Sequence, residues 1–183
     1  MSRDYVAEQI GWLDGVIAHP DNPGLFPEGD RSTIQRELAR RWVDENRMEL
    51  LDGLADRFGE EEVLAVIDTI IAVNCRRDWT RIGKESENNS LDAFIQKLWG
   101  PLKDIGFEYS VEKTGNQTKF CVTKCSMYDL ARSIGAEKWF YHLVCLTDEH
   151  TVTGFNSRIK FSRTRTLMQG HPHCDHCYTD LSS

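Results

Sequence analysis

The chain of 183 residues is 40% hydrophobic and 28% charged, an ordinary globular mixture that argues against intrinsic disorder. Acidic residues outnumber basic residues by 29 to 22, and the resulting net charge of −7 argues against a nucleic-acid partner, since phosphate backbones select basic surfaces. No apolar stretch approaches the ~18 residues that span a bilayer, and the first residues do not resemble a signal peptide. We therefore expect no membrane association and a cytoplasmic location.

Helical periodicity dominates the first half of the chain. A short segment over 5–17 carries apolar residues at helix-like spacing. Residues 32–58 predict one long helix that Ser32 could cap, although its apolar stripe shifts partway along. Residues 60–82 predict a second helix, opened by three glutamates that suit the positive end of the helix dipole. Residues 91–104 predict a third helix, and Pro101 inside it should kink or restart the helix at that point.

After Gly106 the pattern changes from helical to alternating. Residues 107–123 alternate around the turn-forming sequence Thr-Gly-Asn-Gln and predict an antiparallel hairpin. Two short helices and two strands are predicted to follow, over 127–134, 138–146, 157–168 and 174–179. The fold class is therefore α+β, with a helical N-terminal part followed by an antiparallel sheet with short flanking helices.

The six cysteines are unevenly distributed between the two regions that this fold class predicts. Cys75 alone lies in the helical region, 1–90, and the other five lie in the α+β region, 91–183, which we expect to pack with the helices into one compact unit. In a cytoplasmic protein such cysteines are thiols or metal ligands more often than disulfides. The distribution points to chemistry in the second half of the chain.

The densest group of reactive side chains is His-Pro-His-Cys-Asp-His-Cys-Tyr, residues 171–178. Thiolates and imidazoles are the preferred ligands of zinc and of softer transition metals. The C-x-x-C within this run lacks the second pair that a closed zinc site normally has. The expected metal ligands are Cys125, Cys145, Cys174, Cys177 and His173, with the choice between zinc and iron left open.

Three of these cysteines lie at the ends of predicted elements. Cys125 closes the hairpin, Cys145 closes a helix and Cys174 opens the last strand, while Asp148 follows Cys145 by three residues. Ends of separate elements can converge on one pocket, and we expect these side chains to do so. The alternative is that the cysteines are small buried hydrophobic residues, as free cysteines often are.

Other polar pairs are candidates for binding a substrate. Arg163 and Arg165 share a face of the predicted strand and offer the planar fork that matches a carboxylate, although salt bridges to surface acids would explain them equally well. Asn74 and Asp78 share a helical face, which is either the solvated end of a helix or a surface that closes over a ligand.

Five segments between residues 60 and 180 together resemble a known family. They are Val122–Cys125, Leu130–Gly135, Val144–Asp148, Ile159–Gly170 and Cys174–Tyr178. In the order and spacing of Cys, Gly, Asp and Arg, they resemble the L-2-amino-thiazoline-4-carboxylic acid hydrolase-like family. The resemblance implies hydrolytic opening of a 2-aminothiazoline ring to a carbamoyl-cysteine.

The resemblance also implies functional residues at matching positions. It carries over Cys125, Cys145, Asp148 and Cys174, whereas Cys177 and the neighbouring histidines have no match in the family pattern and favour a metal. Ring opening needs water to add to a C=N carbon, a base or metal that activates the water, and a cation for the substrate carboxylate.

We therefore expect a hydrolase that acts on a small cyclic amidine or thiazoline carboxylate, with or without metal assistance. The expected catalytic residues are Cys174 as a thiolate nucleophile, Asp148, and His176 as base or ligand. The substrate would contact Arg163, Arg165, Asn74 and Asp78. A non-enzymatic metal- or iron–sulfur-binding sensor or accessory protein is the alternative. A ligand-binding module whose helical part forms a homodimer is a third.

Overall fold

The computed structural model describes residues 11–19, 22 and 24–182, so residues 5–10 of the first apolar segment lie outside the described part. The chain forms two compact units, 1–74 and 75–183, which are described in turn. The boundary lies inside the long helix α5 (Glu60–Glu85), which contributes residues to both units. The helix predicted over 60–82 is thus confirmed.

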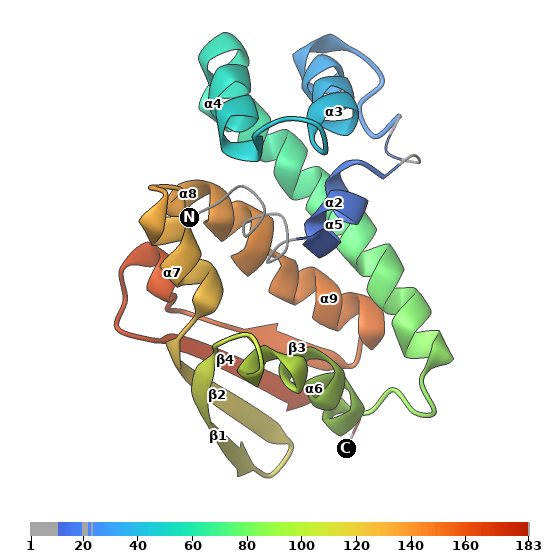
Figure 1. Cartoon of the computed structure of the whole chain (residues 1–183). Helices are drawn as coiled ribbons and strands as arrows, with labels where there is room; N and C mark the ends of the chain where they lie inside the picture. The colour runs from blue at the N-terminus through green and yellow to red at the C-terminus, as the bar shows by residue number, and fades with distance from the viewer. Residues whose placement is uncertain (1–10, 20–21, 23, 183) are drawn as a thin grey trace. The chain divides into compact units, whose positions relative to one another are not determined.

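The first unit is helical and contains α2 (Gly11–Ile17), α3 (Gly29–Arg41), α4 (Arg47–Phe58) and the beginning of α5 (Figure 1). The single helix predicted over 32–58 is wrong, because the chain breaks between α3 and α4. Asn46 starts α4 by accepting a hydrogen bond from the backbone N–H of Met48, as an N-cap residue does. Ser32, the predicted cap, instead lies buried within α3.

The break between α3 and α4 is held by side chains of the same unit. Asp14 Oδ1 accepts hydrogen bonds from the Trp42 indole at 3.0 Å and from Arg47 Nη2 at 2.6 Å. Trp42 is fully buried, so these contacts hold the end of α3 and the start of α4 against α2. The shift of the apolar stripe near Glu45 is the sequence sign of this break.

The second unit carries shorter helices around a sheet. They are the end of α5, α6 (Leu91–Trp99), η1 (Pro101–Lys103), α7 (Ser126–Ser133), α8 (Glu137–Phe140), η2 (Tyr141–Cys145), α9 (Thr147–Phe155) and η3 (Leu167–Gln169). The helix predicted over 91–104 is interrupted at its proline: α6 ends at Trp99 and the chain restarts at Pro101 as the short helix η1. The element η2 has the wide turns of a π-helix. Helix α9 was not predicted. None of the described helices combines the length and hydrophobicity needed to cross a membrane.

The described part of the chain contains one four-stranded antiparallel sheet in the order β1-β2-β4-β3. Its strands are β1 (Glu108–Thr114), β2 (Gln117–Lys124), β3 (Ile159–Ser162) and β4 (Cys174–Asp180). The predicted hairpin and last strand are confirmed, and Gly115, with φ of 58°, occupies the turn of the hairpin. The α+β fold class with a helical N-terminal part is also confirmed.

The predicted strand over 157–168 is wrong beyond Ser162, because the next residues bond to a side chain and not to the sheet. The Asp175 carboxylate accepts hydrogen bonds from the backbone N–H groups of Thr164 and Arg165, at 2.9 and 2.6 Å. Thr166 then caps the short helix η3. The segment after β3 is therefore a loop tied to β4.

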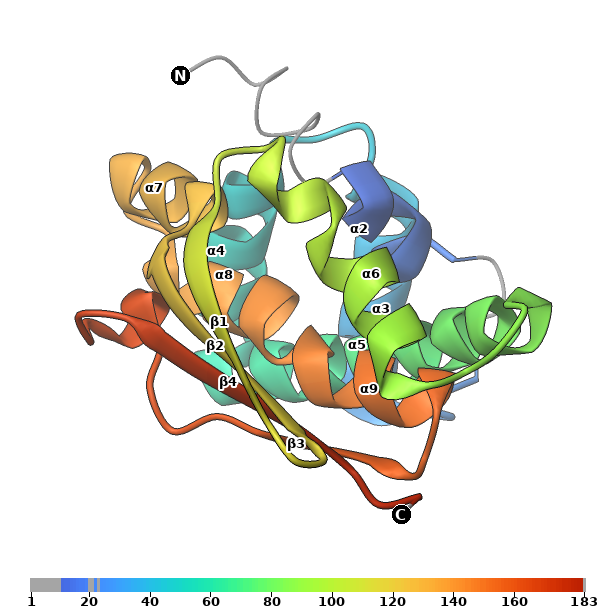
Figure 2. The same cartoon turned by 90° about the horizontal axis from the view of Figure 1, so that it is seen from below.

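Alternation along β4 gives the sheet two faces with different surroundings. Cys174, His176 and Tyr178 are buried on what we call the inner face, whereas Asp175 and Cys177 lie on the half-exposed outer face. Helices α6 and α9 lie on the same side of the sheet (Figure 2), and their residues pack with those of the inner face in one core cluster.

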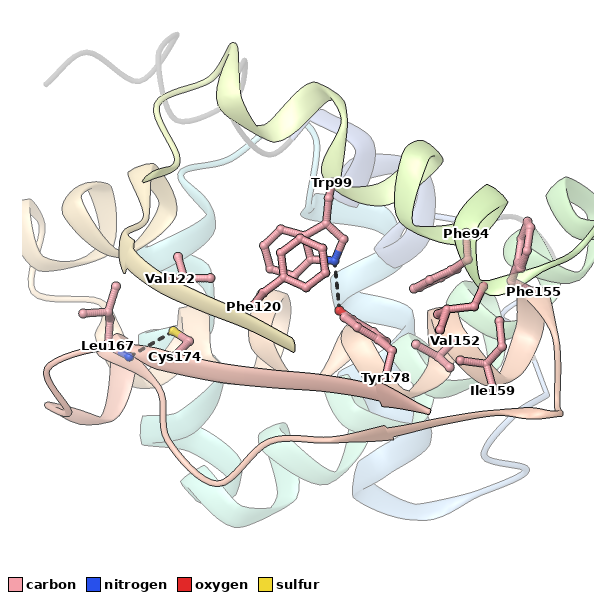
Figure 3. Packing of buried hydrophobic residues seen from close by; sticks show 11 residues of the cluster. Phe94, Trp99, Phe120, Val122, Val152, Phe155, Ile159, Leu167, Cys174 and Tyr178 are labelled. Atoms are coloured by element: carbon pink, nitrogen blue, oxygen red, sulfur yellow. Dashed lines mark hydrogen bonds between the residues drawn. The ribbon is translucent and has the colours of Figure 1, made fainter. Parts of the chain in front are cut away.

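Aromatic side chains from α6 and from the inner face form the middle of this core. Trp99 stacks on Phe120 with ring centroids 4.0 Å apart, and its indole N–H donates a hydrogen bond to Tyr178 Oη at 3.2 Å (Figure 3). Phe94 lies 5.5 Å from the Tyr178 ring. The inner face is therefore rigidly packed where it carries His176 and Cys174.

Two glycines allow helices α5 and α9 to approach closely in the second unit. A Cβ at Gly83 would lie 2.5 Å from the carbonyl oxygen of Phe155, and one at Gly154 would lie 2.5 Å from that of Arg76. Thr80 Oγ1 also donates a hydrogen bond to the Gly154 carbonyl at 3.2 Å. This crossing fixes α9, whose first turn carries Asp148.

Candidate functional site

A buried group of three charged or titratable side chains lies beside the inner face of the sheet. Asp148 Oδ2 accepts a hydrogen bond from Arg163 Nη1 and lies 3.3 Å from His176 Nε2. The Arg163 side chain is only 8% exposed, and its Nη2 donates to the carbonyl oxygen of Cys145 at 3.1 Å. The sequence predicts catalytic roles for Asp148 and His176 and a substrate contact for Arg163, and the structure brings these three side chains into direct contact.

Three separate elements supply this group. Asp148 lies in the first turn of α9, directly after the π-helical turns of η2, which end at Cys145. Arg163 follows the last residue of β3, and His176 lies in the middle of β4. Single π-helical turns are frequent at functional sites, and here the turn presents the Cys145 carbonyl to Arg163.

The charges of the group keep Asp148 ionised. Burial alone would raise the pKa of this carboxyl, but the interaction with His176 and the positive charge of Arg163 outweigh it, so its pKa lies below the ordinary value. Arg163 is likewise buried, yet the nearby carboxylate raises its pKa further. The pair therefore carries a fixed negative and a fixed positive charge at neutral pH.

His176 Nε2 lies 3.3 Å from Asp148 Oδ2 and 3.4 Å from Arg163 Nη1. The carboxylate can only accept a hydrogen bond and the guanidinium can only donate one, and we place the hydrogen on Nε2 because the contact with Asp148 is the shorter of the two. Nδ1 then has a free lone pair, and it is buried without a hydrogen-bond partner. Trp99 and Phe161 enclose the ring, with centroids 5.0 and 5.9 Å away.

Three thiols surround the charged group. Burial raises the pKa of Cys125 to about 12, and it also raises the pKa values of Cys145 and Cys174. The positive charge of Arg163 opposes the effect of burial on the pKa of Cys145, and the negative charge of Asp148 adds to it. The Cys174 thiol also accepts a hydrogen bond from the backbone N–H of Leu167 at 3.2 Å. All three are therefore neutral thiols at neutral pH.

The structure does not bring the whole set of expected metal ligands together. Cys174 and Cys177 point to opposite faces of β4, because residues three apart on a strand alternate sides. His173 and Cys177 line a cavity of about 360 Å³ on the outer face. Among the described residues, no three His, Cys, Asp or Glu side chains are arranged to hold a metal ion.

The remaining expected substrate contacts lie elsewhere. Arg165 is exposed, and its backbone N–H is bound to Asp175. Asn74 belongs to the first unit, is 1% exposed, and donates to the carbonyl oxygen of Val16 at 2.8 Å. Asp78 belongs to the second unit and forms a half-exposed ion pair with Arg77.

Sequence reasoning did not single out Trp99 and Phe161, which enclose His176. Trp99 is the last residue of α6, and only its tertiary contacts with β2 and β4 show what it surrounds. Asp175 was read as one member of a metal-binding run, yet it organises the loop that follows β3. No pattern in the sequence indicates these roles.

Comparisons with known proteins bear on the identity of this domain. No curated protein matches the chain significantly. Among solved structures, the phenol-responsive sensory domain of the transcription activator PoxR, crystallised with phenol, aligns with a TM-score of 0.47 and 13% identity over 74% of this chain and 73% of that one. The family model for L-2-amino-thiazoline-4-carboxylic acid hydrolase matches residues 35–178. The chain therefore belongs to the L-2-amino-thiazoline-4-carboxylic acid hydrolase family.

Proposed function

We propose that the protein hydrolyses a small cyclic amidine or thiazoline carboxylate of the 2-aminothiazoline-4-carboxylate type. The observation that carries this proposal is the buried Asp148–His176 pair, in which the carboxylate holds the ring and the second ring nitrogen is unpartnered. A histidine held by a carboxylate is a suitable general base near neutral pH. Family membership supplies the class of substrate.

In the proposed reaction, His176 Nδ1 accepts a proton from water as the water oxygen adds to the C=N carbon of the ring, and it returns that proton to the nitrogen of the former C=N bond. The tetrahedral intermediate then collapses: the bond from this carbon to one ring heteroatom breaks, the carbamoyl C=O forms, and the hydroxyl proton passes through His176 to the leaving heteroatom. One water is consumed and a carbamoyl-cysteine is released. Arg163 has N–H groups beyond those bound to Asp148 and Cys145, and these would bind the substrate carboxylate.

Water is the proposed nucleophile in place of the Cys174 thiolate. Burial raises the pKa of Cys174, so little thiolate is present at neutral pH, and only the thiolate is strongly nucleophilic. Cys125, Cys145 and Cys174 would then form a polarisable wall beside the ring sulfur.

The test is the hydrolysis of 2-aminothiazoline-4-carboxylate, followed by mass spectrometry of the carbamoyl-cysteine product. His176→Gln keeps an N–H that can reach Asp148 but removes the base, and we expect kcat to fall by roughly 10²- to 10⁴-fold. His171→Gln makes the same change at an exposed histidine and should leave kcat unaltered. Circular dichroism would establish that both variants are folded.

Two results would overturn the proposal. The substrate assignment is wrong if the folded wild-type protein gives no product, and the base is wrong if His176→Gln retains wild-type kcat. Cys174→Ser separates the two nucleophiles: water attack predicts a kcat within about tenfold of wild type, whereas a covalent mechanism predicts loss of turnover.

A further inference from the structure

The outer face of the sheet carries a second group of reactive side chains. The cavity of about 360 Å³ on this face is lined by His176 of the proposed hydrolase site and by residues that the hydrolase does not use, among them Glu112, Lys119, Cys121, His173, Asp175 and Cys177. It thus gathers residues from β1, β2 and β4 and from the loop before β4. Its two cysteines are free and half-buried, so both are accessible from the cavity.

Strand register makes the two thiols neighbours. Cys121 pairs with Asp175 across β2 and β4, and Lys119 pairs with Cys177. Cys121 and Cys177 are therefore diagonal neighbours on the same face, a relation in which Cα atoms lie ~7–8 Å apart and Cβ atoms lie closer. One soft ion between the sulfur atoms can bridge such a pair.

We propose that the outer face binds a soft monovalent cation such as Cu(I) between the thiolates of Cys121 and Cys177. Thiolates select soft ions, and Cu(I) accepts two of them in a linear arrangement. An ion that requires three or four protein ligands does not suit the site, since no three donors converge in the described part of the chain. Cys177, the C-x-x-C cysteine that does not face the inner site, would thereby be paired with Cys121 of β2.

Binding breaks two S–H bonds, forms two S–Cu bonds and releases two protons to solvent, so the bound group carries one negative charge. Lys119 lies directly opposite Cys177 in the register and is the basic residue of the cavity that can offset that charge. Asp175, opposite Cys121, and Glu112 and His173 also line the cavity, and the two carboxylates oppose the bound anion. Because thiols must lose protons, binding should strengthen as pH rises.

The test is a titration of the fully reduced protein with Cu(I) under anaerobic conditions, in competition with a chromophoric Cu(I) chelator. We expect one equivalent to be held by the wild-type protein. Cys121→Ser and Cys177→Ser should each weaken binding by more than ~100-fold, and Lys119→Ala by about tenfold, as loss of a supporting group does. Cys75→Ser, which removes a buried thiol of helix α5 that does not line the cavity, should bind as wild type does.

Alkylation with iodoacetamide, read by mass spectrometry, gives an independent measurement. Without Cu(I), Cys121 and Cys177 should react before the buried Cys174, and one equivalent of Cu(I) should protect those two positions alone. Unchanged affinity in either outer-face serine variant would overturn the proposal. Protection that falls on Cys174 and its neighbours on the inner face would also overturn it. Neither measurement depends on turnover of a thiazoline.

Discussion

Removal of the Asp148 carboxylate should destabilise the protein far more than loss of a surface ion pair. In Asp148→Ala the Arg163 guanidinium stays buried at 8% side-chain exposure, and the Cys145 carbonyl remains as an acceptor. Breaking a buried pair from one side typically costs ~3–5 kcal/mol, because the other charge is left uncompensated. An exposed pair is worth at most about 1 kcal/mol.

Two further variants separate the charge from the packing. Asp148→Asn retains an oxygen that can accept from Arg163, so its loss should be smaller than that of Asp148→Ala. The double variant Asp148→Leu/Arg163→Met replaces both partners with apolar groups, and such replacements are often neutral or stabilising. We therefore expect the double variant to be more stable than Asp148→Ala.

Urea denaturation at pH 7, monitored by circular dichroism, measures these differences as free energies of unfolding. The change of this stability difference with pH gives a second test. The pKa of Asp148 is lowered in the folded state, so its contribution is full above the unfolded value of ~3.9 and disappears as pH falls through the lower folded value. The gap between wild type and Asp148→Ala should accordingly narrow below about pH 4. A gap under ~1 kcal/mol at pH 7, or one that is independent of pH, would refute this reasoning.

Two other substitutions test the framework around the site. Gly154→Ala should lower the free energy of unfolding by ~1–3 kcal/mol, because its Cβ would lie 2.5 Å from the carbonyl oxygen of Arg76. Gly53→Ala adds a Cβ with no atom within 4 Å, so it should raise the free energy of unfolding by about 0.5–1 kcal/mol. If the two variants changed the melting temperature equally, the close approach of α5 and α9 would be contradicted. Trp99→Phe should cost at least ~1–3 kcal/mol in urea unfolding, because the buried Tyr178 hydroxyl loses its hydrogen-bond partner, and a neutral result would show that this bond has no net value.

Much of the fold was predictable from the sequence because its periodicities are local. The hairpin, the helix over 60–82 and the last strand carry regular patterns, and the structure confirms them. Helix α9 lacks a clear stripe, and its position depends on a close crossing that only Gly83 and Gly154 allow. The end of β3 at Ser162 depends on hydrogen bonds from Thr164 and Arg165 to Asp175, which lies 11 and 10 positions further along the chain. A local sequence pattern does not reveal contacts at that separation.

The candidate site was predictable in its members but not in its grouping. Asp148 was indicated by its place three residues after Cys145, and Arg163 by its face of the predicted strand, and the structure places both beside His176. The grouping of Cys174 with Cys177 followed the C-x-x-C spacing, although the predicted strand already implied that residues three apart face opposite ways. Where two patterns overlap, the backbone geometry decides which side chains meet.

The length of the turn before β4 has to be conserved even if its composition is not. A gain or loss of one residue between Gly170 and Cys174 that shifted this strand by one position would rotate every side chain to the other surface. His176 would leave Asp148 for solvent, and Cys177 would be driven among the aromatic rings. A single insertion there would disrupt the buried site and the outer-face cavity at once, whereas substitution of His171, which does not line the cavity, would disturb neither.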